Sequence, residues 1–262
     1  MIAGPRYFAA LAARLRWDAD TLDLTADAES WSALDPARRS RLTVLLAGFC
    51  IAESRVADEL APFEPAAKDP AMAAVFAAQR ADERRHYRLF DRIAALMLGA
   101  PPGDPGSRRR FVRALVPPPL LDLFERRLPE TASALSGGRA ELVDAVALYH
   151  LILEGVVLSA GQHALLAELG DGALPGVRRG VELVERDERW HVGFGLRCML
   201  ARDPGSASVL TLLEEGQAAI GAWGPAVSAE IRSRVLAQHR RRLAAIGLIP
   251  EARAHATVGR SG

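Results

Sequence analysis

Four long segments of helical periodicity, each with a glutamate near its middle, constrain this 262-residue chain more than any other feature. Two of them open with aspartate followed by proline, at Asp35-Pro36 and Asp69-Pro70, which is an N-cap followed by a residue suited to the first helical turn. Apolar residues then recur at the spacing of an amphipathic helix. If the four helices pack side by side, their central glutamates lie at a similar depth of one bundle. The predicted helices cover residues 35–64, 69–98, 139–169 and 174–201.

Two of these central glutamates stand alone in apolar surroundings. Glu53 follows the run VLLAGFCIA, and Glu154 is the only charged residue in LILEGVVL. An ionised carboxylate that is buried without a partner costs several kcal/mol at the least. Glutamates that face one another in a core also repel, so the pattern predicts a cation between them.

The other two central glutamates belong to a pentapeptide that occurs twice, as DERRH and as DERWH. Glu83 and His86, like Glu188 and His191, are three residues apart and therefore share one helix face. A single pair of this kind is typical of an exposed helix, but two pairs that alternate with two isolated glutamates are far more specific. One glutamate from each of two helices and a Glu-x-x-His pair from each of the other two are the ligands of carboxylate-bridged dinuclear metal sites.

The types of ligand in this set narrow the choice of metal. Oxygen ligands with one imidazole per metal favour iron or manganese, and the absence of paired thiolates argues against structural zinc. A metal-bound histidine also needs an acceptor for its far N–H, and the aspartate of the opposite pentapeptide, Asp82 or Asp187, is the candidate. The predicted metal ligands are Glu53, Glu83, His86, Glu154, Glu188 and His191.

The segments outside the four helices also carry helical signals, and almost no strand signal is present. A proline- and glycine-rich connector at 99–106 precedes short helices that are expected to reach about Leu128, with a break at Pro117–Pro119. After a break at Asp203-Pro204-Gly205, one more helical region is expected to run to about Ile246.

No low-complexity linker divides the chain, so we predict one all-α domain over residues 1–262. Its metal-binding core would be a four-helix bundle formed by residues of about 35–201. Additional helices are expected around 107–136 and 206–246.

Composition narrows the class of protein. The net charge is +1, and the arginine runs at 108–110 and 240–242 are expected to be solvated helix faces rather than a nucleic-acid site. Cys50 and Cys198 lie in apolar helical patterns, which favours buried free thiols in a reducing compartment. No signal-peptide pattern is present, and the most apolar run, 143–160, is too short to span a bilayer. We expect a soluble cytoplasmic protein with no nucleic-acid or membrane partner.

The order and spacing of the ligands, with the strings RADERRH and ERDERWHVGFG, resemble the ferritin-like superfamily. Within it, the chain is most similar to the ribonucleotide reductase small subunit and the ligand-binding oxidases related to it. The resemblance covers roughly residues 35–201. It implies a ferritin-like four-helix bundle, and it places the metal ligands of the family on the six residues named above.

The chain departs from the reductase pattern at tyrosines that are used in ribonucleotide reduction. The reductase subunit usually stores a radical on a tyrosine seven residues after its first Glu-x-x-His glutamate, where this chain has Phe90. Members with a manganese–iron pair also lack that tyrosine, so Phe90 alone decides little. The reductase further needs a tyrosine in its C-terminal tail, whereas the tyrosines here are Tyr7, Tyr87 and Tyr149. Together these departures argue against ribonucleotide reduction.

Two residues are candidate catalytic groups. Tyr149 lies five residues before Glu154, where the ligand-binding oxidases have a tyrosine that is crosslinked to a valine two residues after the first ligand. Here Arg55 takes that valine's position and Val56 follows it, so a crosslink is not implied and Tyr149 is either poised near the metals or a core aromatic. Arg55 would neutralise carboxylates, hold an anionic substrate or face solvent. His150 is left open between a metal ligand, a residue that supports a ligand and a structural residue.

The leading expectation is an oxidase or oxygenase that activates O₂ at two iron ions or a manganese–iron pair and acts on a small or fatty organic substrate in an apolar pocket. No flavin or iron–sulfur motif is present, so an external electron donor is expected, and we expect a homodimer. The alternatives are a ferritin-like iron-binding or storage protein, a ribonucleotide reductase-type radical generator and an acyl-carrier-protein desaturase. A ferritin bundle does not require the additional helices outside the core, which argues against iron storage.

Overall fold

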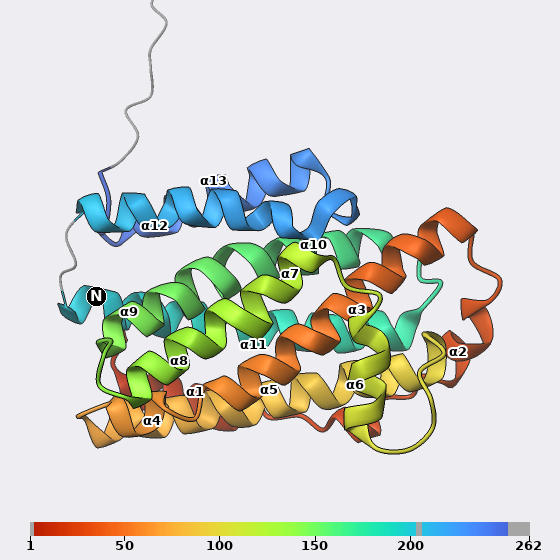
Figure 1. The fold of residues 1–262 in the computed structure, drawn as a ribbon, viewed down its shortest axis with the longest axis horizontal. Coiled ribbons are helices and arrows are strands. Elements are labelled where there is room, and N and C mark those ends of the chain that lie inside the picture. Colours follow the sequence, from red (N-terminus) through yellow and green to blue (C-terminus); the bar gives the residue numbers. More distant parts are fainter. Residues whose placement is uncertain (1–2, 203–205, 251–262) are drawn as a thin grey trace, which may run out of the picture.

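The computed structural model describes residues 3–202 and 206–250, which form a helical bundle (Figure 1). Helices and no strands occur in these ranges, so the all-α prediction is confirmed. The break predicted at Asp203-Pro204-Gly205 lies outside the described residues.

The four long helices of the sequence pattern form the core of the bundle. Asp35 and Asp69 cap the first two as predicted, because their carboxylates accept hydrogen bonds from the amides of Arg38 and Ala71 at 2.9 and 2.8 Å. α3 packs against α5, and the third helix packs against α11. The core helices are α3 (Pro36–Glu59), α5 (Pro70–Met97), the continuous α9, η3 and α10 (Leu142–Val146, Ala147–Leu158 and Ser159–Glu168) and α11 (Pro175–Arg202).

The third core helix is π-helical through its middle, over η3. Hydrogen bonds in this geometry join residues five apart, and such stretches are frequent at functional sites. Tyr149 and Glu154 are five residues apart, so the π-helical turn places them on the same face of the helix. In an ordinary α-helix His150, four residues before Glu154, would share that face instead.

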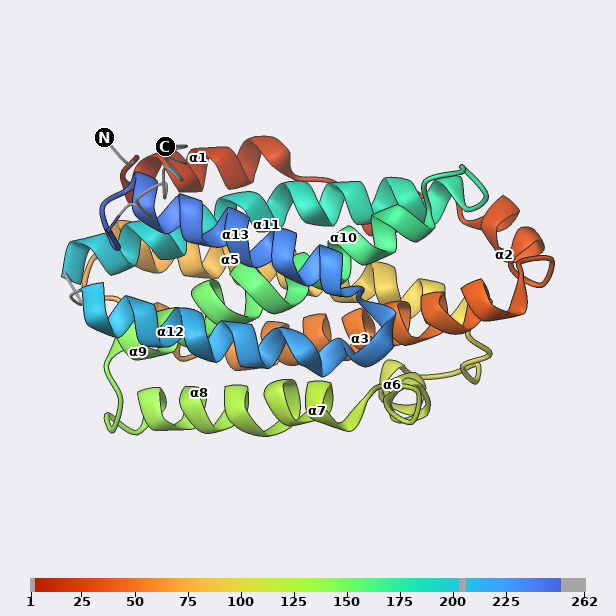
Figure 2. The same ribbon diagram turned by 90° about the horizontal axis from the view of Figure 1, so that it is seen from above.

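The remaining helices surround the core. α12 and α13 lie across one face of the bundle (Figure 1), and Figure 2 shows α1 along one edge and the row α6, α7 and α8 along the opposite edge. The surrounding helices are α1 (Pro5–Leu15), η1 (Ala19–Thr21), α2 (Thr25–Trp31), α4 (Phe63–Ala66), α6 (Pro105–Arg113), α7 (Pro118–Leu121), η2 (Asp122–Arg127), α8 (Leu128–Ser136), α12 (Ser206–Ala219), η4 (Ile220–Ala226) and α13 (Ala229–Ala245).

Several boundaries differ from the predicted ones. α3 ends at Glu59 rather than near residue 64, because Pro62 has no amide N–H with which to continue the helix. The helix expected to reach about Leu128 continues through Pro129 to Ser136, within the 107–136 region where additional helices were expected, and Pro129 is the second residue of α8, which directly follows the π-helical η2. The N-terminal helices α1 and α2 were not predicted.

One helix, Leu142–Glu168, is long and apolar enough by length and composition to cross a membrane, although the sequence pattern had suggested too short a run. In the structure 83% of its most apolar window is buried inside the protein. Its hydrophobicity is therefore accounted for by its place in the core.

Trp223 of η4 joins the outer helices to the core. Its ring is fully buried, and its indole N–H donates to the Val157 carbonyl of η3 at 2.7 Å. Gly48 of α3 and Gly161 of α10 make room for the ring, since a Cβ at either position would lie 2.4 Å from a ring carbon. The missing side chains of these two glycines are thus a packing requirement.

A Gly161→Ala substitution tests this packing. The added methyl group would displace the Trp223 ring, so we expect the free energy of unfolding to fall by about 1–3 kcal/mol, although alanine is the better helix former. Gly221→Ala is the matched control, because nothing lies within 4 Å of its added Cβ, and its effect should stay within about 0.5 kcal/mol. Urea denaturation of both variants measures the difference, and equal stabilities would contradict the packing role.

Candidate metal centre

Six side chains from the four core helices converge inside the bundle. Each Glu-x-x-His pair projects from one helix face, and each lone glutamate lies within a buried apolar stretch of its helix. At most 4% of any of these residues is exposed. They are Glu53 from α3, Glu83 and His86 from α5, Glu154 from η3, and Glu188 and His191 from α11.

Two of the carboxylates face both histidines. Glu83 places Oε1 3.0 Å from Nδ1 of His191 and Oε2 3.2 Å from Nδ1 of His86. Glu188 likewise places Oε1 3.4 Å from Nδ1 of His86 and Oε2 3.8 Å from Nδ1 of His191. Each carboxylate thus spans the space between the two imidazoles.

The two lone glutamates lie on opposite sides of this shared pair. Glu53 is 3.5 Å from Nδ1 of His86, and Glu154 is 3.3 Å from Nδ1 of His191. The cluster therefore divides into two groups of four residues, each with ligand atoms within 4.8 Å of one another. The first group adds Glu53 and His86 to the shared pair, and the second adds Glu154 and His191.

The cluster has more buried acceptors than donors. Both carboxylate oxygens of Glu53, both of Glu188 and Oε2 of Glu154 have no hydrogen-bond partner. Burial raises the pKa of Glu154 to about 8 and that of Glu53 well above its usual range. Burial thus disfavours the ionised form of these carboxylates, and two divalent ions with carboxylate and imidazole ligands would stabilise it.

The histidines are orientated by aspartates of the opposite helix. Nε2 of His86 lies 3.4 Å from Oδ2 of Asp187, and Nε2 of His191 lies 3.5 Å from Oδ2 of Asp82. Both Nδ1 atoms are left facing the glutamates, as ligand atoms should. The crossed arrangement is the one that the repeated pentapeptide suggested.

Asp187 has further partners that the sequence did not reveal. The indole N–H of Trp17 donates to its Oδ2 at 2.7 Å, and the Arg85 guanidinium lies 3.4 Å from the same oxygen. Although burial acts to raise it, hydrogen bonds to His86 and Trp17 hold the pKa of Asp187 at about 2. Trp17 comes from the segment between α1 and η1, and no periodicity links that segment to the site.

Tyr149 is hydrogen-bonded to the cluster. Its hydroxyl donates to Oε1 of Glu83 at 2.7 Å and accepts from the Gln79 amide at 3.2 Å. The same amide donates to Oε1 of Glu154 at 3.1 Å. Gln79 was not among the predicted site residues, although it lies four residues before Glu83 and so on the same helix face.

His150 lies beside this network. Its Nε2 is 3.1 Å from the Oε1 atom of Gln79, and burial lowers its pKa to about 3, so the ring is neutral. Gly195 of α11 leaves space for it, since a Cβ there would lie 2.2 Å from that of His150. Of the three roles considered, this geometry agrees best with support of a ligand through Gln79.

The structure does not bring Arg55 to the cluster. Its guanidinium pairs with Glu59 at 2.9 Å and donates to the Phe124 carbonyl at 3.4 Å. Phe90, at the position of the reductase tyrosine, is buried and stacks on Phe49 with 5.1 Å between ring centroids.

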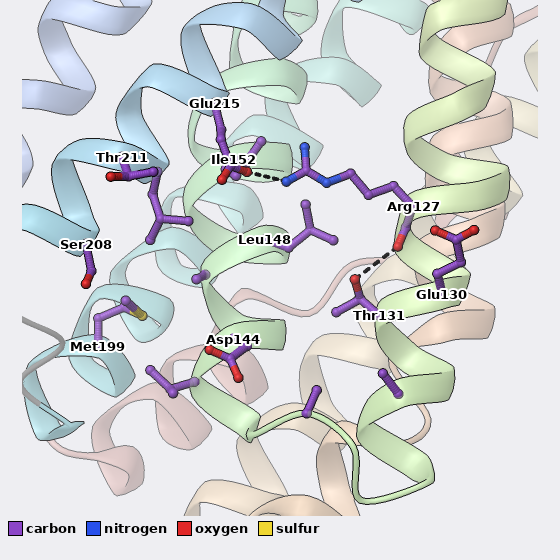
Figure 3. Close-up of a pocket in the computed structure, with 15 residues that line it drawn as sticks. Arg127, Glu130, Thr131, Asp144, Leu148, Ile152, Met199, Ser208, Thr211 and Glu215 are labelled. Atoms are coloured by element: carbon purple, nitrogen blue, oxygen red, sulfur yellow. Dashed lines mark hydrogen bonds and ion pairs between the residues drawn. The ribbon is translucent and has the colours of Figure 1, made fainter.

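Cavities that differ in volume and in lining residues lie near the third core helix. One of about 760 Å³ opens between α8, η3 and α12, with an apolar wall that includes Leu148 and Ile152 and a rim that includes the Arg127–Glu215 ion pair (Figure 3). None of the six clustered residues lines it. A smaller cavity of about 110 Å³ does include Glu154 and Glu188.

The bundle and its cluster define a ferritin-like helical protein with a carboxylate–histidine site able to hold two metal ions. The sequence model of the family described as "Ribonucleotide reductase, small chain" matches residues 7–202, and the chain belongs to that family.

Curated relatives include ribonucleoside-diphosphate reductase small chains of Nicotiana tabacum and Trypanosoma brucei brucei. They are 26% and 24% identical to this chain over 185 residues, which is 70% of its length. The matched part is 53% and 52% of the two relatives, so the chain spans about half the length of the curated relatives that it matches.

Solved structures with the same fold include point mutants of an R2-like ligand-binding oxidase. One with an anaerobically reconstituted Mn/Fe cofactor has a TM-score of 0.79 at 18% identity, covering 95% of this chain and 94% of that one. Another with an aerobically reconstituted Fe/Fe cofactor has a TM-score of 0.72 at 19% identity, covering 93% and 85%. The predicted ferritin-like fold is thereby confirmed.

An Asp187→Asn substitution tests the role of the crossed aspartates. The amide cannot support His86 as a carboxylate does, so Mn(II) affinity should fall about 10- to 100-fold, as measured by titration of the metal-free protein. Asp171→Asn is the control, because this exposed aspartate pairs with Arg38 far from the cluster. An unchanged affinity in Asp187→Asn would show that His86 needs no such support.

Proposed function

We propose that this chain is a non-haem oxidoreductase with two iron ions or a manganese–iron pair, which uses O₂ to oxidise a small organic substrate. The observation that carries the proposal is the pair of shared carboxylates, since Glu83 and Glu188 each belong to both groups of potential ligands. A metal pair held there would supply reductive activation of O₂. The Mn/Fe and Fe/Fe cofactors of the solved neighbours support this reading.

The protein contributes charge, geometry and exclusion of water. Four glutamates balance the charge of two divalent ions, and Asp82 and Asp187 keep the histidines in the orientation that a metal requires. The unpartnered oxygens of Glu53 and Glu188 would be available to hold the ions. The surrounding apolar core keeps bulk water away from a reactive centre.

Tyr149 is the side chain that we assign to proton or electron transfer at the cluster. Burial raises the pKa of its phenol well above the usual value, so the hydroxyl keeps its proton in the resting protein. The 2.7 Å hydrogen bond directs this proton to Oε1 of Glu83, so the phenol holds a proton at the cluster.

Trp17 is a candidate entry point for electrons from an external donor. Its half-buried indole is hydrogen-bonded to Asp187, and its ring stacks on His86 with 6.2 Å between centroids. An oxidisable ring thus lies between the surface and a predicted metal ligand. The donor itself and a homodimeric state stay predictions, the latter to be measured by analytical ultracentrifugation.

A second candidate function is that of a radical generator for ribonucleotide reduction. Membership of the small-chain family and the names of the curated relatives favour it. Against it, Phe90 supplies no phenol at the position of the reductase tyrosine, and a phenol at the cluster comes instead from Tyr149. We therefore prefer the oxidase.

Metal analysis after anaerobic loading tests the centre. We expect two Fe(II) or Mn(II) ions per chain, one for each group of ligands. Glu154→Ala should lose the ion of the second group, because this residue and His191 complete it. Hundreds of iron ions per assembly after O₂ exposure would indicate storage instead, and unchanged uptake in Glu154→Ala would contradict the ligand assignment.

A Tyr149→Phe substitution tests the phenol. Metal binding should be retained because the ring volume is kept, whereas the reaction of the Fe(II)-loaded protein with O₂ should slow by roughly tenfold or more, as expected when a positioned proton donor is lost. Stopped-flow absorbance measures the rate. Tyr87→Phe is the matched control, because that hydroxyl contacts the Pro105 carbonyl rather than the cluster, and equal rates in both variants would exclude a role for Tyr149.

A further inference from the structure

The small cavity that includes two of the predicted ligands also reaches the surface of the protein. It lies between α10, α11 and α13 and extends from the exposed Arg189 to the buried Glu154 and Glu188. Its volume of about 110 Å³ leaves room for roughly three or four water molecules at ~30 Å³ each. Hydrophilic species of that size can therefore approach the cluster from this side.

The inner end of the cavity has polar groups without partners. Both oxygens of Glu188 and Oε2 of Glu154 accept no hydrogen bond. Gln162 of α10 also lines the cavity, is only 3% exposed and has no partner for its amide nitrogen. A buried amide without a partner costs about 1–3 kcal/mol, so this end of the cavity is suited to a polar occupant.

The outer end carries charges of both signs. Glu185 pairs with Arg189 at 2.9 Å, one turn along α11. Arg242 of α13 is half-buried and forms no ion pair within the described part of the chain. Carboxylates thus occur at the mouth and at the base of the cavity, with one unpaired guanidinium beside the mouth.

We propose that this cavity is the route by which divalent metal ions enter the cluster, an inference that rests on the metal centre proposed above. The clustered residues are enclosed by the core, and this cavity links two of them to solvent. Carboxylate and amide oxygens along it can replace the water molecules that an Fe²⁺ or Mn²⁺ ion sheds, since these ions favour oxygen ligands. Glu185, which pairs with Arg189, supplies the carboxylate at the mouth, and the unpaired Arg242 opposes entry of the ion.

The rate at which the metal-free protein takes up Mn(II) tests the route. Rapid mixing followed by freeze-quench measures it through loss of the EPR signal of free Mn(II). Gln162→Met, which removes an oxygen ligand, and Glu185→Gln, which removes a negative charge, keep side-chain size and should each slow uptake roughly three- to tenfold. Arg242→Gln, which removes a positive charge, should accelerate uptake by a similar factor, as expected for local electrostatic effects. Met199→Leu, which lines the larger cavity, is the control and should leave the rate unchanged.

The number of Mn(II) ions finally bound per chain distinguishes an error in the proposed route from an error in the proposed metal centre. Two ions per chain bound at unchanged rates in all three variants would overturn the route alone. The opposite signs, with faster uptake in Glu185→Gln and slower uptake in Arg242→Gln, would also overturn it, because cations would then not be the species attracted. No Mn(II) bound by the unsubstituted protein would refute the metal centre itself. Since Glu185 and Arg242 lie at the outer end of the cavity, the test remains decisive if Gln162→Met fails to fold.

Discussion

Mutual repulsion among four buried carboxylates is the constraint on which the rest of this structure depends. Glu53, Glu83, Glu154 and Glu188 lie in an apolar interior, where an unpaired charge is strongly unfavourable. The two imidazoles cannot supply every oxygen with a partner, and five carboxylate oxygens of the cluster have none. A bundle with this interior is therefore built to hold cations, and its long helices bring the ligands to one depth.

The crossed aspartates make the two halves of the site depend on each other. His86 of α5 is supported by Asp187 of α11, while His191 of α11 is supported by Asp82 of α5. The shared carboxylates Glu83 and Glu188 come from the same two helices. A shift of one helix along the other would thus disturb the orientation of both histidines at once.

The helical core and the clustered residues could be predicted from the sequence because both follow from local rules. Periodicity and capping located the long helices, and a three-residue spacing placed each Glu-x-x-His pair on one face. The π-helical register of η3 could not be predicted in this way. It is this register that turns Tyr149 rather than His150 toward the cluster. The contact of Trp17 with Asp187 was equally inaccessible to sequence reasoning, because it depends on tertiary packing between distant segments. Arg55 instead pairs with Glu59 one turn along its own helix, and its contact with the Phe124 carbonyl also depends on tertiary packing.

The cavities bear on which substrates can meet the metals. η3 presents Tyr149 and Glu154 to the cluster, whereas its Leu148 and Ile152 line the larger cavity on the side of α12 (Figure 3). An organic molecule in that cavity is therefore separated from the ligands by a helix. The cavity that includes Glu154 and Glu188 is much smaller, at about 110 Å³ against about 760 Å³. An organic molecule bound in the larger cavity would therefore reach the ligands only if η3 or its neighbours moved.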